Sequence, residues 1–183
     1  MGVVYGKLFN QFCVSLFMEF NRVIEGRRSI RSFEPVDVED EKVKEILEAI
    51  SYVPSAHNLQ DYEVFVIKSP AKRKSMVFAA LGQDFVEQAP VVFVVCADTE
   101  KEGTKKGYLY AIESASMVAY MVCLKAYELG LGSCWIGAFN EDDLKDVLQL
   151  PAKLMPVAMI TVGYTKENPA MPKRRDDYYH LVD

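Results

Sequence analysis

A helical repeat of apolar positions marks the segment 37–53, which reads DVEDEKVKEILEAISYV. Val43, Ile46, Leu47 and Ile50 are spaced so that they fall on one side of a helix. Acidic residues at its start favour the same assignment, because they face the positive end of the helix dipole. The pattern predicts an amphipathic helix.

Four shorter segments are rich in the β-branched and aromatic residues that strands prefer. They cover residues 62–68, 90–98, 133–137 and 156–164. The second, PVVFVVCAD, is apolar at almost every position, which is typical of a central strand that is buried on both faces. We therefore expect a central sheet of about four strands.

Three further helices are expected between these strands. Residues 69–82 and 140–150 begin at Ser69 and Asn140, whose side chains suit the capping position. Residues 108–129 are apolar on nearly every side, as in a helix that is buried in a core or against a partner chain. The order of elements indicates one domain with an α+β or α/β fold.

The composition is that of an ordinary globular domain and narrows the range of functions. The chain has 183 residues, enough for one domain with a full core, and half of them are hydrophobic. A net charge of −5 argues against general nucleic-acid binding, which needs a basic face. No apolar run reaches the length of about 18 residues that a membrane span needs, so we expect no membrane partner.

The first 20 residues, MGVVYGKLFNQFCVSLFMEF, are apolar, but Asn10 and Gln11 interrupt them and no small-residue cleavage site follows. These features argue against a signal peptide. Two interpretations stay open: residues 1–17 cover an apolar patch as an extra amphipathic segment, or they are an upstream extension with Met18 as the natural start. In both, they precede a domain at 18–183.

The cysteines and histidines do not form a recognisable site. The four cysteines are widely spaced in apolar surroundings and read as small core residues in a reducing compartment (Cys13, Cys96, Cys123 and Cys134). With only His57 and His180 present, a His-based metal site is not expected. We expect a cytoplasmic protein with no disulfide and no metal. The G-x-G-x-x-G, P-loop, H-E-x-x-H and G-x-S-x-G patterns are absent from the sequence.

Basic side chains gather near both ends of this acidic chain. The stretch GRRSIRSFEP holds Arg27, Arg28 and Arg31 around two serines, and a later PKRR supplies Lys173–Arg175. Charge runs of this kind are often only solvated surface. Arginine also forms bidentate hydrogen bonds with phosphate, so a second interpretation is that the two ends converge on one phosphate group.

Two other stretches suit a flat ligand. PSAHNLQ (54–60) is a polar loop whose Asn58 and Gln60 amides both donate and accept, although turn chemistry explains it equally well. GLGSCWIGAF leaves Gly137 where a backbone N–H can approach a ligand, or it is a strand end with Trp135 as a core residue.

The ordered set RRSIRSF, PSAHNLQ, ELGLGSCWIG, VGY…NP and PKRR resembles the nitroreductase family of FMN-dependent oxidoreductases, from about residue 20 to the end. The resemblance implies an α+β fold with a central mixed sheet of four to five strands, flanked by helices, in an intertwined homodimer. Two FMN sites would lie at the dimer interface, where the helix at 108–129 would also pack.

The resemblance also implies which residues bind FMN. Phosphate and ribityl contacts would come from Arg27, Ser29, Lys173 and Arg175. Arg31 would lie near the pyrimidine side of the ring. The loop at 54–60 would contact the ring from the partner subunit, and the backbone at Ile136 and Gly137 would approach flavin N5. The set is Arg27, Arg28, Ser29, Arg31, Pro54, Ser55, Ala56, Asn58, Gln60, Ile136, Gly137, Lys173 and Arg175.

The implied activity is that of an FMN-dependent NAD(P)H oxidoreductase. NADH or NADPH would reduce FMN and leave, and a small acceptor such as a nitroaromatic or a quinone would take its place. No side chain is assigned as acid or base, because the flavin carries the chemistry. Two alternatives stay open: a flavin-binding protein without nicotinamide-linked turnover, and a specialised flavin reductase with another reductant.

Two dipeptides depart from the family pattern. Asp61-Tyr62 stands where relatives often carry Pro-Trp, and Tyr120-Met121 stands where they often carry Gln-Asn. Either Asp61 faces the pocket and repels anionic acceptors, or it caps a turn. Both departures leave FMN binding in place and bear on the choice of substrate.

Overall fold

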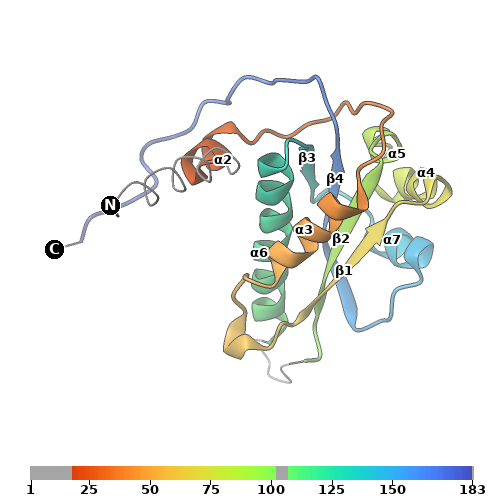
Figure 1. The fold of residues 1–183 in the computed structure, drawn as a ribbon. Helices are drawn as coiled ribbons and strands as arrows, with labels where there is room; N and C mark the ends of the chain where they lie inside the picture. The colour runs from red at the N-terminus through yellow and green to blue at the C-terminus, as the bar shows by residue number, and fades with distance from the viewer. Residues whose placement is uncertain (1–17, 102–106, 183) are drawn as a thin grey trace, which may run out of the picture.

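The centre of the molecule is a sheet of four strands in the order β1-β2-β4-β3 (Figure 1). The structure is a computed structural model, and it describes residues 18–101 and 107–182. The strands are β1 (Tyr62–Ile67), β2 (Val91–Asp98), β3 (Gly132–Ile136) and β4 (Leu154–Gly163). Each begins and ends within about two residues of its predicted segment, in line with the usual uncertainty of element boundaries.

Every neighbouring pair of strands in this sheet is antiparallel. The expectation of a mixed sheet is therefore wrong for these four strands. Ile67 at the end of β1 pairs with Val92 near the start of β2. The connection between these strands therefore returns the chain to the same end of the sheet that it left. Within the described residues, one isolated parallel bridge joins Ser29 to Ser133 of β3.

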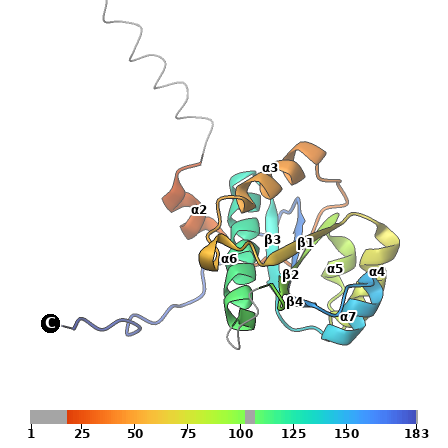
Figure 2. The same cartoon turned by 90° about the horizontal axis from the view of Figure 1, so that it is seen from below.

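Helices cover both faces of the sheet and make a three-layer sandwich (Figure 2). One face carries α2 (Phe20–Gly26), α3 (Asp40–Ile50) and α6 (Gly107–Glu128). The other carries α4 (Pro70–Ala79), α5 (Phe85–Gln88) and α7 (Glu141–Leu148). A short 3-10 turn, η1 (Ala56–Asn58), lies in the loop after α3.

The continuous apolar run of β2 is explained by the two helical layers. All eight of its residues are buried. Alternate side chains belong to different cores: Val91, Phe93, Val95 and Ala97 pack with α3 and α6, and Val92, Val94 and Cys96 pack with α4, α5 and α7. A strand covered on both sides needs apolar residues at every position, even in an antiparallel sheet.

The predicted caps are present at two helices. The Ser69 hydroxyl accepts a hydrogen bond from the backbone N–H of Lys72 at 3.5 Å, at the start of α4. The Asn140 side chain accepts from the N–H of Asp143 at 3.0 Å, at the start of α7. Each bond satisfies an N–H that has no partner inside its own helix.

The long helix α6 packs along the sheet and has one uncovered side. Its buried face includes Ala111, Ala115 and Val118, which contact the larger core. Leu109, Met117 and Tyr120 are exposed on the other side. By length and by a mean hydropathy of 1.3, α6 would also qualify as a membrane span, but core helices of soluble proteins qualify in the same way.

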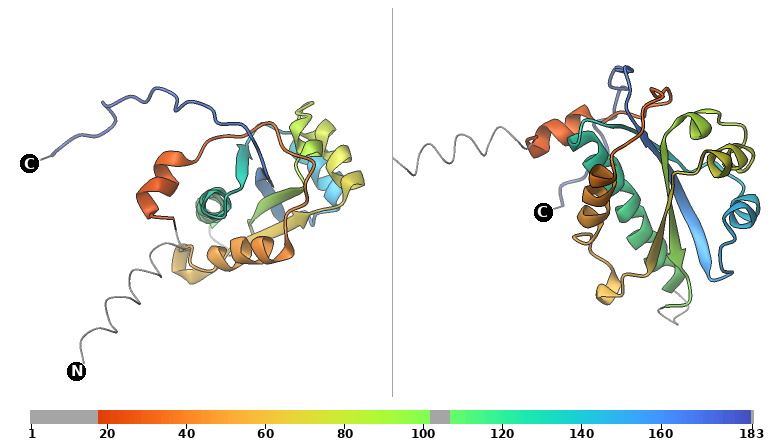
Figure 3. Two further views of the ribbon diagram at one scale, coloured as in Figure 1. Left: turned by 45° about the horizontal axis from the view of Figure 1, so that its top comes forward. Right: turned by 45° about the vertical axis from the view of Figure 1, so that its right-hand side comes forward.

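The chain after β4 leaves the sheet as an extended tail. Figures 1 and 3 show residues 164–182 passing from the end of β4 across the side of the molecule that carries α2. Residues 170–182 are exposed throughout. The N-terminal extension 1–17, with Cys13, lies outside the described residues.

Candidate functional site

The arginine segment, residues 27–33, begins where α2 ends. Arg27 leaves the helical conformation, with φ −56° and ψ 132°. Ser29 then forms the bridge to Ser133, and the Ile30 N–H donates to the Ser133 carbonyl at 2.9 Å. In extended backbone, side chains alternate between two sides. Arg27, Ser29 and Arg31 therefore share one side, and Ile30, only 5% exposed, lies on the other.

A cavity of about 430 Å³ adjoins this segment, and we call it the arginine pocket. Four arginines and no carboxylate are among the described residues that line it. The lining residues are Ile24, Arg27, Arg28, Ser29, Arg31, Tyr120, Pro169, Ala170, Met171, Pro172 and Arg174. The structure thus brings the arginine segment and Arg174 of the C-terminal tail to one basic pocket.

The first two arginines of the pocket have different partners. The Arg28 guanidinium donates to the carbonyls of Glu25 at 2.6 Å and Arg27 at 2.8 Å, so it caps the end of α2. The Arg27 guanidinium instead lies 5.9 Å from the ring centre of Tyr120 on α6, a cation–π contact. Among the described residues, the Arg27 guanidinium donates no hydrogen bond, so its donors can serve an anion.

The tail contributes a residue that the sequence did not single out. Arg174 lines the arginine pocket, whereas Lys173 and Arg175 are not among its lining residues. Arg175 instead has its Nε atom 3.9 Å from the Asp177 carboxylate. All three stand in the same run, and nothing in the sequence indicates which of them faces inward. Tyr120 was noticed only as a departure from the family pattern.

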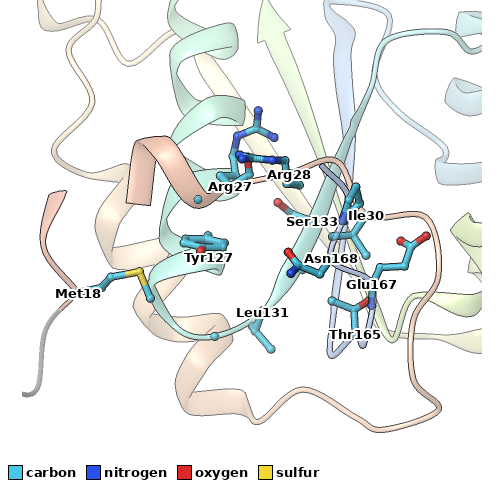
Figure 4. Close-up of a pocket in the computed structure, with 14 residues that line it drawn as sticks. Met18, Arg27, Arg28, Ile30, Tyr127, Leu131, Ser133, Thr165, Glu167 and Asn168 are labelled. Carbon is cyan, nitrogen blue, oxygen red and sulfur yellow. The ribbon is translucent and has the colours of Figure 1, made fainter. Parts of the chain in front are cut away.

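A second, smaller cavity of about 220 Å³ lies behind the arginine segment, and we call it the rear pocket (Figure 4). Arg28, Tyr127, Ser133 and Glu167 are among its lining residues. Two glycines allow the chain to pass close by. A Cβ atom on Gly26 would lie 2.1 Å from the Tyr127 hydroxyl oxygen, and one on Gly132 would lie 2.7 Å from Thr165 Cγ2.

The loop PSAHNLQ lies at the other end of α6 from the arginine pocket (Figure 1). His57, Asn58 and Gln60 all have positive φ angles, at 51°, 56° and 49°. Such angles are uncommon outside glycine and often occur at functional sites. The Ser55 hydroxyl accepts from the Gln60 N–H at 2.9 Å and fixes the turn. Within one chain, Pro54 and its neighbours do not meet the arginine pocket.

The end of β3 carries the remaining predicted residues. Ile136 is buried and pairs with Met159 of β4, and Gly137 is exposed just after the strand. A Cβ atom on Gly137 would make only an ordinary contact, 3.6 Å from the Trp135 indole nitrogen. Within one chain, a side chain at position 137 would therefore fit without a clash. Trp135 is half-buried against the larger core, as the core interpretation predicted.

Asp61 does not face the arginine pocket. It is completely buried beside the loop at 54–60, and its carboxylate oxygens have no hydrogen-bond partner in the described part of the chain. Its backbone carbonyl accepts from the Asp98 N–H at 3.0 Å. Within one chain, Asp61 does not line the arginine pocket, and its carboxylate caps no turn among the described residues.

The described cysteines are core residues. Cys96, Cys123 and Cys134 are free and buried. Burial raises the pKa of Cys96 to about 12 and that of Cys123 to about 11. Thiols with such pKa values are poor nucleophiles at neutral pH, because the thiolate is the reactive form. Across residues 18–101 and 107–182, no group of three metal-ligating side chains was found.

The fold and the site define a class. This is an α+β domain in which a basic pocket lies between the start of the domain and its tail. The sequence model of the nitroreductase family matches residues 24–164. The chain belongs to the nitroreductase family, and it is an oxidoreductase of that family.

Curated relatives and solved structures agree with this membership. An NADH dehydrogenase of Thermus thermophilus is 31% identical over 174 residues, which cover 77% of this chain and 84% of the relative. An FMN reductase (NAD(P)H) of Bacillus subtilis is 28% identical over 175 residues, with 84% and 70% covered. The crystal structure of a nitroreductase family protein from Clostridium novyi matches with a TM-score of 0.77 at 29% identity, covering 85% of this chain and 89% of that one.

Proposed function

We propose that this protein is an FMN-dependent NAD(P)H oxidoreductase that works as a cytoplasmic homodimer. The observation that carries the proposal is the arginine pocket, where Arg27, Ser29 and Arg31 share one side of an extended segment and Arg174 joins them from the tail. Family membership and a relative named FMN reductase support the flavin.

The pocket fits the phosphate end of FMN. Planar guanidinium groups donate paired hydrogen bonds to phosphate oxygens, and the Ser29 hydroxyl adds a further donor. Among the described lining residues there is no carboxylate to repel a dianion. The cavity of about 430 Å³ lies in the size range of small-molecule sites. We assign Arg27, Ser29 and Arg174 to the phosphate and ribityl chain, with Lys173 and Arg175 as further candidates.

Arg31 serves the ring end of the site in this proposal. When bound, FMN supplies the acceptance of a hydride and the delivery of electrons to the acceptor. The arginine segment runs parallel to β3, so it carries Arg31 from the level of Ser133 toward Gly137. A guanidinium there stabilises negative charge on the ring, and the Gly137 backbone is open to a ligand. No side chain is assigned as a general acid or base.

Two observations support a second copy of the chain. The exposed apolar side chains of α6, among them Leu109 and Met117, leave this helix without a cover on one side. The loop with Ser55, Ala56, Asn58 and Gln60 lies far from the arginine pocket of its own chain (Figure 1). In a homodimer the loop of one subunit would reach the flavin of the other, and α6 would be buried.

The proposed cycle is ping-pong. NADH or NADPH binds over the flavin, gives up its hydride and leaves, and a small acceptor such as a nitroaromatic or a quinone then occupies the same position. An open pocket that serves both in turn needs no separate nicotinamide site. The arginines hold the cofactor throughout, because their contacts are with its phosphate end.

The test is an absorption spectrum of the purified protein, followed by anaerobic addition of NADH and then NADPH. We expect flavin bands near about 370 and 450 nm that bleach with at least one of the two. Bands that persist with both would contradict nicotinamide-linked turnover. A colourless protein that cannot be reconstituted with FMN would contradict the cofactor assignment itself.

A further inference from the structure

Glu167 joins the C-terminal tail to the arginine segment. Its Oε2 atom accepts hydrogen bonds from the backbone N–H groups of Arg31 at 2.7 Å and Ser32 at 3.0 Å. Both bonds are charge-assisted, because the acceptor is a carboxylate. A single side chain from the tail therefore fixes the direction of two consecutive peptide groups.

Neighbouring residues reinforce this connection. The Thr165 hydroxyl donates to the Ser32 carbonyl at 2.8 Å and accepts from the Glu167 N–H at 2.9 Å. The Glu34 N–H donates to the Tyr164 carbonyl at 2.8 Å. We call residues 31–34 and 164–167, with these bonds, the tail clasp. The clasp spans more than a hundred positions in sequence, so local structure cannot replace it.

Glu167 and Arg31 line different pockets, whereas Arg27 and Arg28 line both. Glu167 and Thr165 line the rear pocket, where Figure 4 shows them on the same side as Ile30. Arg31 lines the arginine pocket. Glu167 thus holds the backbone from behind, while the Arg31 guanidinium faces the other way.

The charge of Glu167 has the wrong sign for an anion site. A carboxylate this close to the arginine pocket repels a phosphate group, so by charge alone it lowers the affinity for an anion. Its benefit must come from geometry: a fixed backbone pre-organises Ser29 and Arg31 and lowers the entropy that ligand binding costs. The two effects have opposite signs, and substitutions can separate them.

We propose that Glu167 is a positioning residue for the arginine pocket, which raises the affinity for the phosphate group of the flavin by fixing the backbone at Arg31 and Ser32. The proposal rests on the proposed function, since it takes FMN as the anion. It adds a residue outside the predicted cofactor-binding set, and this residue anchors the arginine segment to the tail.

The experiment compares Glu167→Ala, Glu167→Gln and the control Glu141→Ala with the unaltered full chain. Glu141 is a half-exposed glutamate on α7, on the opposite face of the sheet, and pairs with Lys145 of the same helix at 2.7 Å. Dissociation constants for FMN and for riboflavin, which has no phosphate, are measured by quenching of flavin fluorescence. Hydrogen exchange of the peptide that contains Arg31 and Ser32 is measured without flavin.

Glu167→Ala removes both charge-assisted bonds to the segment, so ligand binding must then order its backbone. We expect this variant to weaken FMN binding about tenfold and to change riboflavin binding less. Glu167→Gln keeps an acceptor oxygen and removes the repulsive charge, so it should bind FMN at least as tightly as the unaltered chain. The control should leave FMN binding unchanged. The Arg31 and Ser32 amides should exchange faster in Glu167→Ala and stay protected in Glu167→Gln.

Other results would contradict the positioning role of Glu167 or the proposed function itself. If Glu167→Ala and Glu167→Gln both tighten FMN binding, Glu167 acts only through its charge and the positioning role is overturned. Unaltered FMN affinity in Glu167→Ala overturns it as well, whereas absence of FMN binding in the unaltered chain overturns the proposed function. If Glu167→Ala does not fold, Thr165→Val takes its place, with a loss of about threefold in FMN affinity expected for a neutral hydrogen bond.

Discussion

Arg27 and Arg28 are adjacent in the sequence and line the same pocket, but their guanidinium groups have different partners. Arg28 donates to two carbonyls at the end of α2, and Arg27 lies over Tyr120 in the arginine pocket. Both line the arginine pocket, but Arg28 uses donors to cap the end of α2, and Arg27 does not. At the residue scale, the hydrogen-bond partners of the two arginines distinguish a mainly structural role from a binding role.

Substitution of these two arginines should therefore have different consequences. Arg27→Ala should weaken FMN binding by about tenfold to a hundredfold with little change in stability, because a charge-assisted hydrogen bond to phosphate contributes about 1.5–3 kcal/mol. Arg28→Ala should instead lower the free energy of unfolding by about 1 kcal/mol, since the carbonyls that it caps lose their partner. Flavin titration and urea unfolding of both variants measure the contrast. Equal losses of FMN affinity would show that Arg28 also binds the ligand.

At the element scale, the spacing of apolar residues and the capping residues were sufficient to predict most of the helices and strands. The strands and the helices α3, α4, α6 and α7 lie where the sequence predicts them. Each of them buries an apolar face, and the spacing of its apolar residues makes that face recognisable in the sequence. α2 and α5 were missed. They are only 7 and 4 residues long, too short for a helical repeat to stand out, and packing rather than pattern stabilises them.

One ion pair joins two of these elements. The Asp98 carboxylate at the end of β2 accepts from the Lys153 ammonium at 2.6 Å, just before β4. The hydrogen bond to Lys153 lowers the pKa of Asp98 below its ordinary value and raises that of Lys153. A lowered carboxyl pKa means that the pair stabilises the fold above the unfolded pKa of about 3.9. The stabilisation is lost as the pH falls through the folded pKa.

Asp98→Asn should consequently be less stable than the unaltered chain at pH 7, and the difference should shrink as the pH falls below about 4. Urea unfolding at a series of pH values measures both trends. Asp40→Asn is the matched control, because Asp40 pairs with Lys68 in an exposed position, where ion pairs contribute little. A difference that is independent of pH would mean that the charge of Asp98 does not matter.

At the scale of the whole molecule, the uncovered side of α6 is the main feature that one chain leaves unexplained. Met117 and Tyr120 are 40% and 46% exposed on a helix that is otherwise a core element. Large exposed apolar surfaces mark interaction sites. The strained loop at 54–60, far from the arginine pocket, also lacks a function within one chain.

If a second copy covers this surface, Met117→Glu should convert a dimer into a monomer and release bound FMN. A buried carboxylate without a partner is costly enough to oppose association. Light scattering after size-exclusion chromatography measures the mass, and the absorption spectrum of the same peak measures the flavin. Phe78→Glu is the control, since Phe78 is 75% exposed on α4, on the opposite face of the sheet. A Met117→Glu variant that stays dimeric would place the interface elsewhere.

The candidate site could be predicted only in part, and its residues show why. The basic segment at 27–31 was found because the arginines are close in sequence, and the tail because its basic run is compact. Arg174 was not chosen over Lys173 or Arg175, since the direction of a side chain in an extended tail depends on contacts that sequence spacing does not record. Glu167 was missed for the same reason: its partners lie 136 and 135 positions away.

The sequence by itself determined the elements, the apolar core and the family, because each depends on residue types at short and regular spacing. The tertiary structure decided the antiparallel order of the strands, the division of the arginines between cap and pocket, and the burial of Asp61 away from that pocket. It also decided the tail clasp. These features depend on which distant segments meet, and packing of the two helical layers on the sheet sets those meetings.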